Sequence, residues 1–259
     1  MKSGYHGLDV KGNNGYDINA FALTLGADCA FEEYFAAGAF FSFSSPEMEE
    51  DYETADANNY SFGVYAGYKT FADLEIRGTL AYTLSKYDMT RVMGEAGFAT
   101  SSFYGSGLTV SAEIAKPFYF GNFVVRPLFA IDSEIIWQEE AMESGAYAMY
   151  YDKTDDSWTY ARSGAKIDYS VTDQLTLRAK AFYAMQLDDQ GATKTTARFV
   201  GDSKAEQFTG KFVGDDYFNI GVSAAYMFTH NFSVFADYNG FFNSESTSTY
   251  VNGGFQINF

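Results

Sequence analysis

The sequence is poor in cysteine, histidine, proline and basic residues. Its 259 residues include one cysteine, two histidines and three prolines, and Asp plus Glu outnumber Lys plus Arg by 34 to 17. The single Cys29 excludes a disulfide framework and a Cys-rich zinc site. His6 and His230 leave little material for metal or triad chemistry, and we expect no cofactor. A net charge of −17 argues against nucleic acid as a partner, because phosphates require basic groups.

The chain also lacks long apolar runs. None approaches the roughly 18 residues that a transmembrane helix needs, and residues 1–15 contain no apolar stretch that could serve as a signal peptide. A helical span is therefore excluded, whereas the missing signal has little meaning because a processed fragment would lack it too. Glycine, aromatic and hydroxyl residues are spread evenly without a linker, which predicts one domain over residues 1–259.

What the chain does have is aromatic residues that follow a period of two. Phe and Tyr number 26 and 21, yet the mean hydropathy is −0.20, so polar neighbours must dilute the apolar positions. Phe21, Leu23, Leu25 and Ala27 alternate with smaller or polar residues, which is typical of a β-strand. The pattern recurs in eleven segments of about ten residues, a length that crosses a bilayer when strands tilt near 45°. These segments are 20–27, 35–43, 60–68, 74–84, 104–114, 123–131, 159–169, 175–185, 218–228, 232–242 and 251–259.

Short and long connections alternate between these segments. Short turns are expected near 29–34, 69–73, 117–122, 170–174 and 229–231, and long polar loops at 44–59, 88–102, 133–157, 187–216 and 243–248. This alternation is typical of an all-β, transmembrane, antiparallel up-and-down β-barrel. Aromatic residues crowd the short-turn side and predict an interfacial girdle, although a soluble sandwich could also place aromatics near turns. They are Tyr68, Phe71, Tyr119, Phe120, Tyr169, Phe228 and Phe232.

Inside the strands, charged residues occupy the alternate positions that the aromatic residues avoid. A lipid-facing charge at mid-bilayer costs about 2–4 kcal/mol, so we expect these side chains to face the lumen. Six are basic and five acidic, a sum of +1, so the remainder of the chain must carry −18. The lumen is therefore predicted to be nearly balanced and the loops acidic. The eleven residues are Glu75, Arg77, Glu113, Arg126, Asp132, Arg162, Lys166, Asp168, Arg178, Lys180 and Asp237.

The order of several segments resembles the β-barrel translocator domain of classical autotransporters, the type V secretion proteins. The resemblance covers about residues 15–259. Its most specific parts are LTLGADCAF with FAAGAFFSFSS (23–45), YSFGVYAGY and LEIRGTLAYTLSKYDMTR (60–91), VVRPLFAID (124–132), and the terminal FNIGVSAAYMFTHNFSVFADYNGFF and GGFQINF.

This resemblance implies a barrel of about twelve strands in the outer membrane of a Gram-negative bacterium. The eleven segments would be strands 2 to 12, and residues 187–216 the large external loop between strands 9 and 10. Residues 1–14 lack clear alternation, so the first strand is short, atypical or truncated. Because an open edge is not tolerated in lipid, we expect residues 3–10 to pair with both strand 2 and strand 12.

The function implied is a non-enzymatic one, to anchor an N-terminal passenger and translocate it to the cell surface. The passenger and the linker helix that threads the lumen in this family would be partners that the chain does not contain. Some family members cleave the passenger with an acidic lumen residue; for Glu75 and Glu113 we favour ion pairs with Arg77 and Arg126 instead. The alternative function is a stand-alone outer-membrane porin or adhesin.

Other candidate sites are weaker. Ser163 and Lys166 match S-x-x-K, but that chemistry needs a helix and the segment alternates as a strand. The acidic run 47–56 could gather calcium or magnesium, yet it lacks a calcium loop's spacing and is predicted to be a solvated external loop.

The chain ends in an apolar, aromatic alternation. Phe255, Ile257 and Phe259 share one face and resemble the signal that the outer-membrane barrel insertion machinery recognises. The expected partners are thus outer-membrane lipid and this machinery, with the barrel itself a monomer.

Overall fold

The computed structural model describes residues 2–8, 17–31, 34–188, 194–209, 216–244 and 246–258, the first of these ranges by its backbone alone. Almost every element is a strand. The elements are β1 (Lys2–Leu8), β2 (Asp17–Phe31), β3 (Phe35–Glu50), β4 (Glu53–Lys69), β5 (Glu75–Val92), η1 (Gly94–Ala96), β6 (Phe98–Ala115), β7 (Phe118–Phe120), β8 (Phe123–Gln138), β9 (Ala141–Met142), β10 (Ser144–Gly145), β11 (Met149–Tyr151), β12 (Thr154–Ser170), β13 (Leu175–Gln186), β14 (Lys194–Phe199), β15 (Glu206–Thr209), β16 (Tyr217–Thr229), β17 (Phe232–Phe242) and β18 (Ser246–Ile257).

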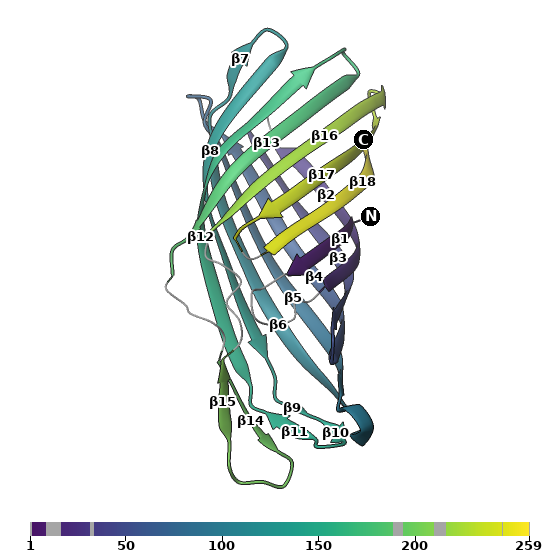
Figure 1. The fold of residues 1–259 in the computed structure, drawn as a ribbon. Helices are drawn as coiled ribbons and strands as arrows, with labels where there is room; N and C mark the ends of the chain where they lie inside the picture. Colours follow the sequence, from purple (N-terminus) through teal and green to yellow (C-terminus); the bar gives the residue numbers. More distant parts are fainter. Residues whose placement is uncertain are drawn as a thin grey trace.

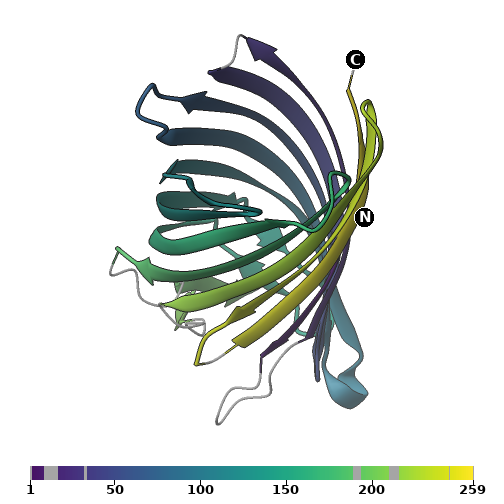
Figure 2. The same cartoon turned by 90° about the horizontal axis from the view of Figure 1, so that it is seen from above.

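Twelve strands of the described residues form an antiparallel ring. Each pairs with its sequence neighbour in the ring, and the β6–β8 and β1–β18 ladders complete the circuit. The order is β1, β2, β3, β4, β5, β6, β8, β12, β13, β16, β17, β18 and back to β1. Figures 1 and 2 show the tilted strands and the curl of the sheet. The all-β up-and-down barrel of about twelve strands is confirmed.

Large apolar side chains lie on the outer face of this ring. Leu80 and Val222 are 47% and 55% exposed, although each lies well inside its strand. In a soluble protein such a belt would be a liability, whereas in a bilayer it meets lipid. Among the described residues, no helix has the length and apolar character needed to cross a membrane.

Several strands extend well past their predicted ends. The segment expected to be a loop at 44–59 is a continuing hairpin, in which β3 reaches Glu50 and β4 begins at Glu53. The loop expected at 88–102 is likewise reduced to the turn around η1. The prediction failed because strand recognition relied on apolar alternation. Beyond the bilayer both faces of a ribbon meet water, so backbone pairing continues without that pattern.

The two longest predicted loops also contain strands. Residues 133–157 and 187–216 supply β9, β11, β14 and β15, which form a separate four-stranded sheet at the end opposite the short turns (Figure 1). At the other end β7 forms a small hairpin with β8 inside the predicted turn 117–122. Strands of two to six residues are too short to show a period, which is why the sequence indicated loops.

The first strand closes only part of the seam between the ends of the ring. Backbone pairing joins β1 to residues 17–22 of β2 and to residues 246–252 of β18. The expected pairing with both strands 2 and 12 is confirmed for residues 3–7; residue 8 pairs with β18 alone among the described residues, and residues 9 and 10 lie outside them. β1 therefore begins about midway along its neighbours (Figure 1), and the short-turn half of the seam lacks a ladder within the described residues.

Candidate functional site: an ionic network on the concave face

Strand register places the eleven predicted charges on one face of the sheet. Directly paired residues share a face, and the ladders pair Arg77 with Glu113, Lys166 with Arg126 and Lys180, and Asp168 with Arg178. Ser223 on β16 pairs with both Arg178 and Asp237, which places Asp237 on the same face. The remaining charged residues lie an even number of positions away from these along the same strands, so their side chains are on the same face.

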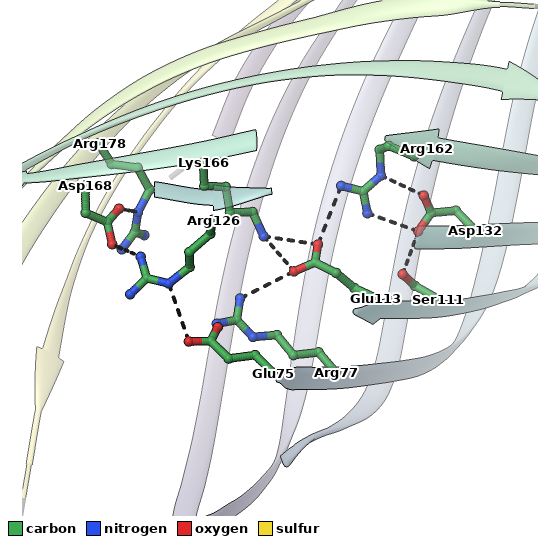
Figure 3. Close-up of polar contacts among 10 residues, drawn as sticks. All are labelled: Glu75, Arg77, Ser111, Glu113, Arg126, Asp132, Arg162, Lys166, Asp168 and Arg178. Carbon is green, nitrogen blue, oxygen red and sulfur yellow. Dashed lines mark hydrogen bonds and ion pairs between the residues drawn. The ribbon is translucent and has the colours of Figure 1, made fainter. Parts of the chain in front are cut away.

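Glu113 on β6 is the centre of this network. Lys166 Nζ on β12 lies 2.8 Å from Glu113 Oε1, Arg77 Nη1 on β5 lies 3.5 Å from the same oxygen, and Arg162 Nη1 lies 3.7 Å from Oε2. β6 and β12 are not neighbours, since β8 runs between them. Side chains converge across an intervening strand on the concave side of a curved sheet, so this contact lies inside the ring (Figure 3).

Asp168 forms a second centre. Arg178 donates to it through Nε at 2.5 Å, and Arg126 donates from the opposite side. Arg126 also donates to Glu75 at 3.4 Å, and Glu75 in turn accepts from Arg77 at 2.8 Å. A continuous chain of charge-assisted contacts thereby joins strands β5, β6, β8, β12 and β13 (Figure 3).

Asp132 ties the network to its outer-loop side. Arg162 Nε donates to Asp132 Oδ2 at 2.8 Å, and Ser111 donates to Oδ1 at 2.5 Å. We call the nine charged residues linked in this way the ionic network: Glu75, Arg77, Glu113, Arg126, Asp132, Arg162, Lys166, Asp168 and Arg178. The other two predicted residues, Lys180 and Asp237, lie farther round the same face on β13 and β17.

Phe182 is a functional neighbour that the sequence reasoning missed. Its ring is buried, and the guanidinium of Arg162 lies 5.1 Å from its centroid, with Lys166 and Lys180 each at 5.9 Å. Gly164 on the adjacent strand makes room for it, because a Cβ there would stand 2.1 Å from the Ala181 carbonyl oxygen and 2.6 Å from the ring. On β13 it is the one aromatic residue at the alternate positions that also hold Arg178 and Lys180, which was the available signal, and cation–π attraction explains its place.

A second ionic contact holds the external strands to the barrel wall. Arg91, at the outer end of β5, donates to both Glu143 oxygens at 3.0 and 2.5 Å and to the Tyr147 carbonyl at 3.1 Å. Burial and the nearby carboxylate of Glu143 raise the pKa of Tyr151 to about 12. Sequence could not predict this pair, because its members are 52 residues apart.

The weaker candidates are dispersed. Ser163 and Lys166 lie on β12, so the S-x-x-K match is on a strand. In the acidic run, Glu47 pairs with Asp56 in the β3–β4 ladder, and no group of three or more metal-binding side chains gathers among the described residues. Phe255 and Ile257 are exposed on one face of β18, while Phe259 lies outside the described residues.

The comparison with protein families identifies the chain. The model described as the autotransporter beta-domain matches residues 3–239. The chain belongs to this family. No curated protein sequence matches it.

Solved translocator structures share the fold. The translocator domain of the autotransporter NalP from Neisseria meningitidis is 14% identical with a TM-score of 0.84, covering 100% of this chain and 86% of that one. The transport unit of AIDA-I from Escherichia coli is 12% identical with a TM-score of 0.62 over 100% and 88%. The beta domain of Bordetella BrkA is 11% identical with a TM-score of 0.64 over 100% and 97%.

Family and fold together make this autotransporter barrel an outer-membrane translocator. The family match reaches from β1 into β17, so it covers the strands that carry the ionic network. The stand-alone porin or adhesin considered from the sequence is not favoured by these findings. The fold family is one of transport domains and implies a Gram-negative outer membrane.

Proposed function

We propose that this barrel anchors an N-terminal passenger in the outer membrane of a Gram-negative bacterium and conducts it to the cell surface. One observation carries the proposal: in this member of a translocator family, a single ring of strands has an apolar outer face and a charged concave face. The outer face exposes Leu80 and Val222 and suits lipid, and the concave face carries charges suited to water and polypeptide. The passenger and the linker helix are the partners implied, and the barrel acts as a monomer.

The concave charges serve as braces in this proposal, and the barrel as a whole is not an enzyme. Glu113 is ringed by three cations, and Glu75 by two arginines. Both carboxylates are already held by these cations in contacts that cross the wall, so we assign passenger cleavage to neither. Replacement of Glu75 or Glu113 should weaken the barrel wall. It should not change whether a passenger is cut from the barrel.

The outer-membrane insertion machinery is the proposed partner for assembly. The exposed apolar face of β18 that includes Phe255 and Ile257 can add to a sheet edge, with main-chain bonds supplying affinity and side chains supplying specificity. The whole chain from residue 1 to 259 is proposed to be a single barrel domain, with an atypical first strand.

A surface-display assay tests the proposed function. A signal peptide, an epitope-tagged reporter and a helical linker would be fused ahead of residue 2, and protease added to intact cells. The epitope should be removed from the barrel by external protease, as expected of a surface-exposed passenger. A matched fusion that ends before β16 should be unable to complete the ring and should leave no epitope outside. Retention of the epitope in the periplasm by the complete barrel, although it has inserted, would contradict the proposal.

A further inference from the structure

A cavity of about 430 Å³ lies on the concave face, beyond the centre of the ionic network. Its walls come from β5, β8, β12, β13, β16 and β17, which stand on opposite sides of the ring. Five cationic side chains and one carboxylate line it: Arg77, Arg126, Lys166, Arg178, Lys180 and Asp237. A cavity lined from β5 to β17 reaches across the lumen, so these charged groups face a solute that passes through.

The carboxylates that balance these cations are placed behind them. Glu113 and Asp168 side chains are 10% and 11% exposed, whereas those of Arg77 and Arg178 are 50% and 52% exposed. The network is nearly neutral by count, but its two most exposed members are these arginines, since its other charged side chains are 10–26% exposed. Each guanidinium has five N–H donors, and its contacts with one or two carboxylates leave donors for a further ligand.

Asp237, the acidic group in the lining, is already engaged. It accepts hydrogen bonds from Asn239 Nδ2 at 2.6 Å and from Asn252 Nδ2 at 2.9 Å. Gly221 pairs with Lys180 and Asn239 across the ladders, and an added Cβ there would stand 2.5 Å from Lys180 Cε and 2.5 Å from Asn239 Oδ1. The absence of a side chain at 221 lets the Lys180 stem lie along the wall of the cavity.

We propose that this cavity is an oxyanion site that gives the lumen a preference for anions, with carboxylates or phosphate as its ligands. Rings of Arg and Lys select anions in pores because the local field outweighs distant charge. The prediction opposes the expectation from the whole chain, whose net charge of −17 would attract cations. The ligand chemistry fits free phosphate and the acidic side chains of a polypeptide equally. The inference concerns the isolated barrel and does not require that it translocate a passenger.

The reversal potential of the purified barrel in planar bilayers tests the selectivity. Under a potassium chloride gradient it should have the sign of a chloride-preferring pore. Lys180→Gln should shift it toward zero, whereas Lys86→Gln, on the outer face and outside the cavity, should leave it unchanged. A potassium-preferring wild type, or equal shifts in the two variants, would overturn the proposal.

Calorimetry in detergent tests the site without depending on conduction. Inorganic phosphate and acetylated tetraglutamate would be titrated into the barrel, with acetylated tetraglutamine as the neutral control. The site is supported if either anion binds, if Lys180→Gln weakens that binding and if Lys86→Gln does not. Which anion binds shows whether the ligand is free phosphate or the acidic side chains of a polypeptide. Absence of heat with both anions, or equal heat with tetraglutamine, rejects it. A barrel that fails to display a passenger but binds these anions would contradict the proposed function alone.

Discussion

Lys166 Nζ on β12 lies 2.8 Å from Glu113 Oε1 on β6, across the strand that separates them. Backbone ladders join only adjacent strands, so contacts of this kind fix the curvature that the ladders leave free. Arg126 reaches Glu75 across β6 in the same way. We infer that the ionic network braces the ring in the region where β6 and β8 meet.

Removal of one central carboxylate should weaken the barrel measurably. Glu113→Gln would leave Lys166, Arg77 and Arg162 facing one another without their shared anion, and we expect a loss of about 3 kcal/mol in the free energy of unfolding. Urea titration of the barrel refolded into lipid vesicles measures this. The matched control is Glu95→Gln, an exposed residue of η1, which should change little. Equal losses would show that Glu113 is not a brace.

The two faces should differ in their tolerance of charge. Arginine at Leu80 or Val222 places a cation in the lipid-facing belt and should cost about 2–4 kcal/mol. Arginine at the neighbouring Thr79 or Ser223, on the network face, should cost clearly less. Denaturant titration in vesicles gives the four values. Similar losses at all four positions would contradict the assignment of the faces.

Sequence predicted the membrane-embedded part of this fold well and the external part poorly. Within the bilayer, lipid on one side and water on the other force a strict alternation, so segments such as 232–242 match β17 in both bounds. Outside it that constraint ends, and the short external strands β9, β10, β11, β14 and β15 leave no pattern. For the site, the alternation of residues along each strand was enough to identify the charges that share one face. Which charge meets which, and that Phe182 lies among them, depends on ring order and curvature, which this alternation does not encode.

The contact around Glu143 predicts a pH effect on the external sheet. Tyr151 has a pKa of about 12 in the folded chain against an ordinary value of 10. Folding therefore favours the protonated phenol, so its contribution to stability is complete below pH 10 and is lost as pH rises toward 12. Limited proteolysis of the segment that contains β9 to β11 should accelerate over this interval. In Tyr151→Phe the added acceleration should disappear; an unchanged profile in that variant would assign the effect to other groups.

The end of the chain should matter more for assembly than for stability. Deletion of Phe259 should slow insertion in cells, because the insertion machinery would lose an aromatic anchor. Refolding of the purified barrel into detergent should change little, since one aromatic side chain contributes at most about 1.5–3 kcal/mol through burial. Comparable losses in both assays would indicate a role in barrel stability, and normal insertion in cells would remove the signal hypothesis.

Spin labels on the two faces of β4 and β6 would test most directly the claim that one ring presents lipid and water on opposite faces. In a Cys29→Ser background, labels would be placed at Val64 and Val110 on the outer face and at Ser61 and Thr109 on the network face. In vesicles, the first two should collide mainly with oxygen dissolved in the bilayer, and the last two mainly with a water-soluble nickel chelate. The reverse pattern, or water access at all four positions, would contradict the transmembrane barrel on which the account depends.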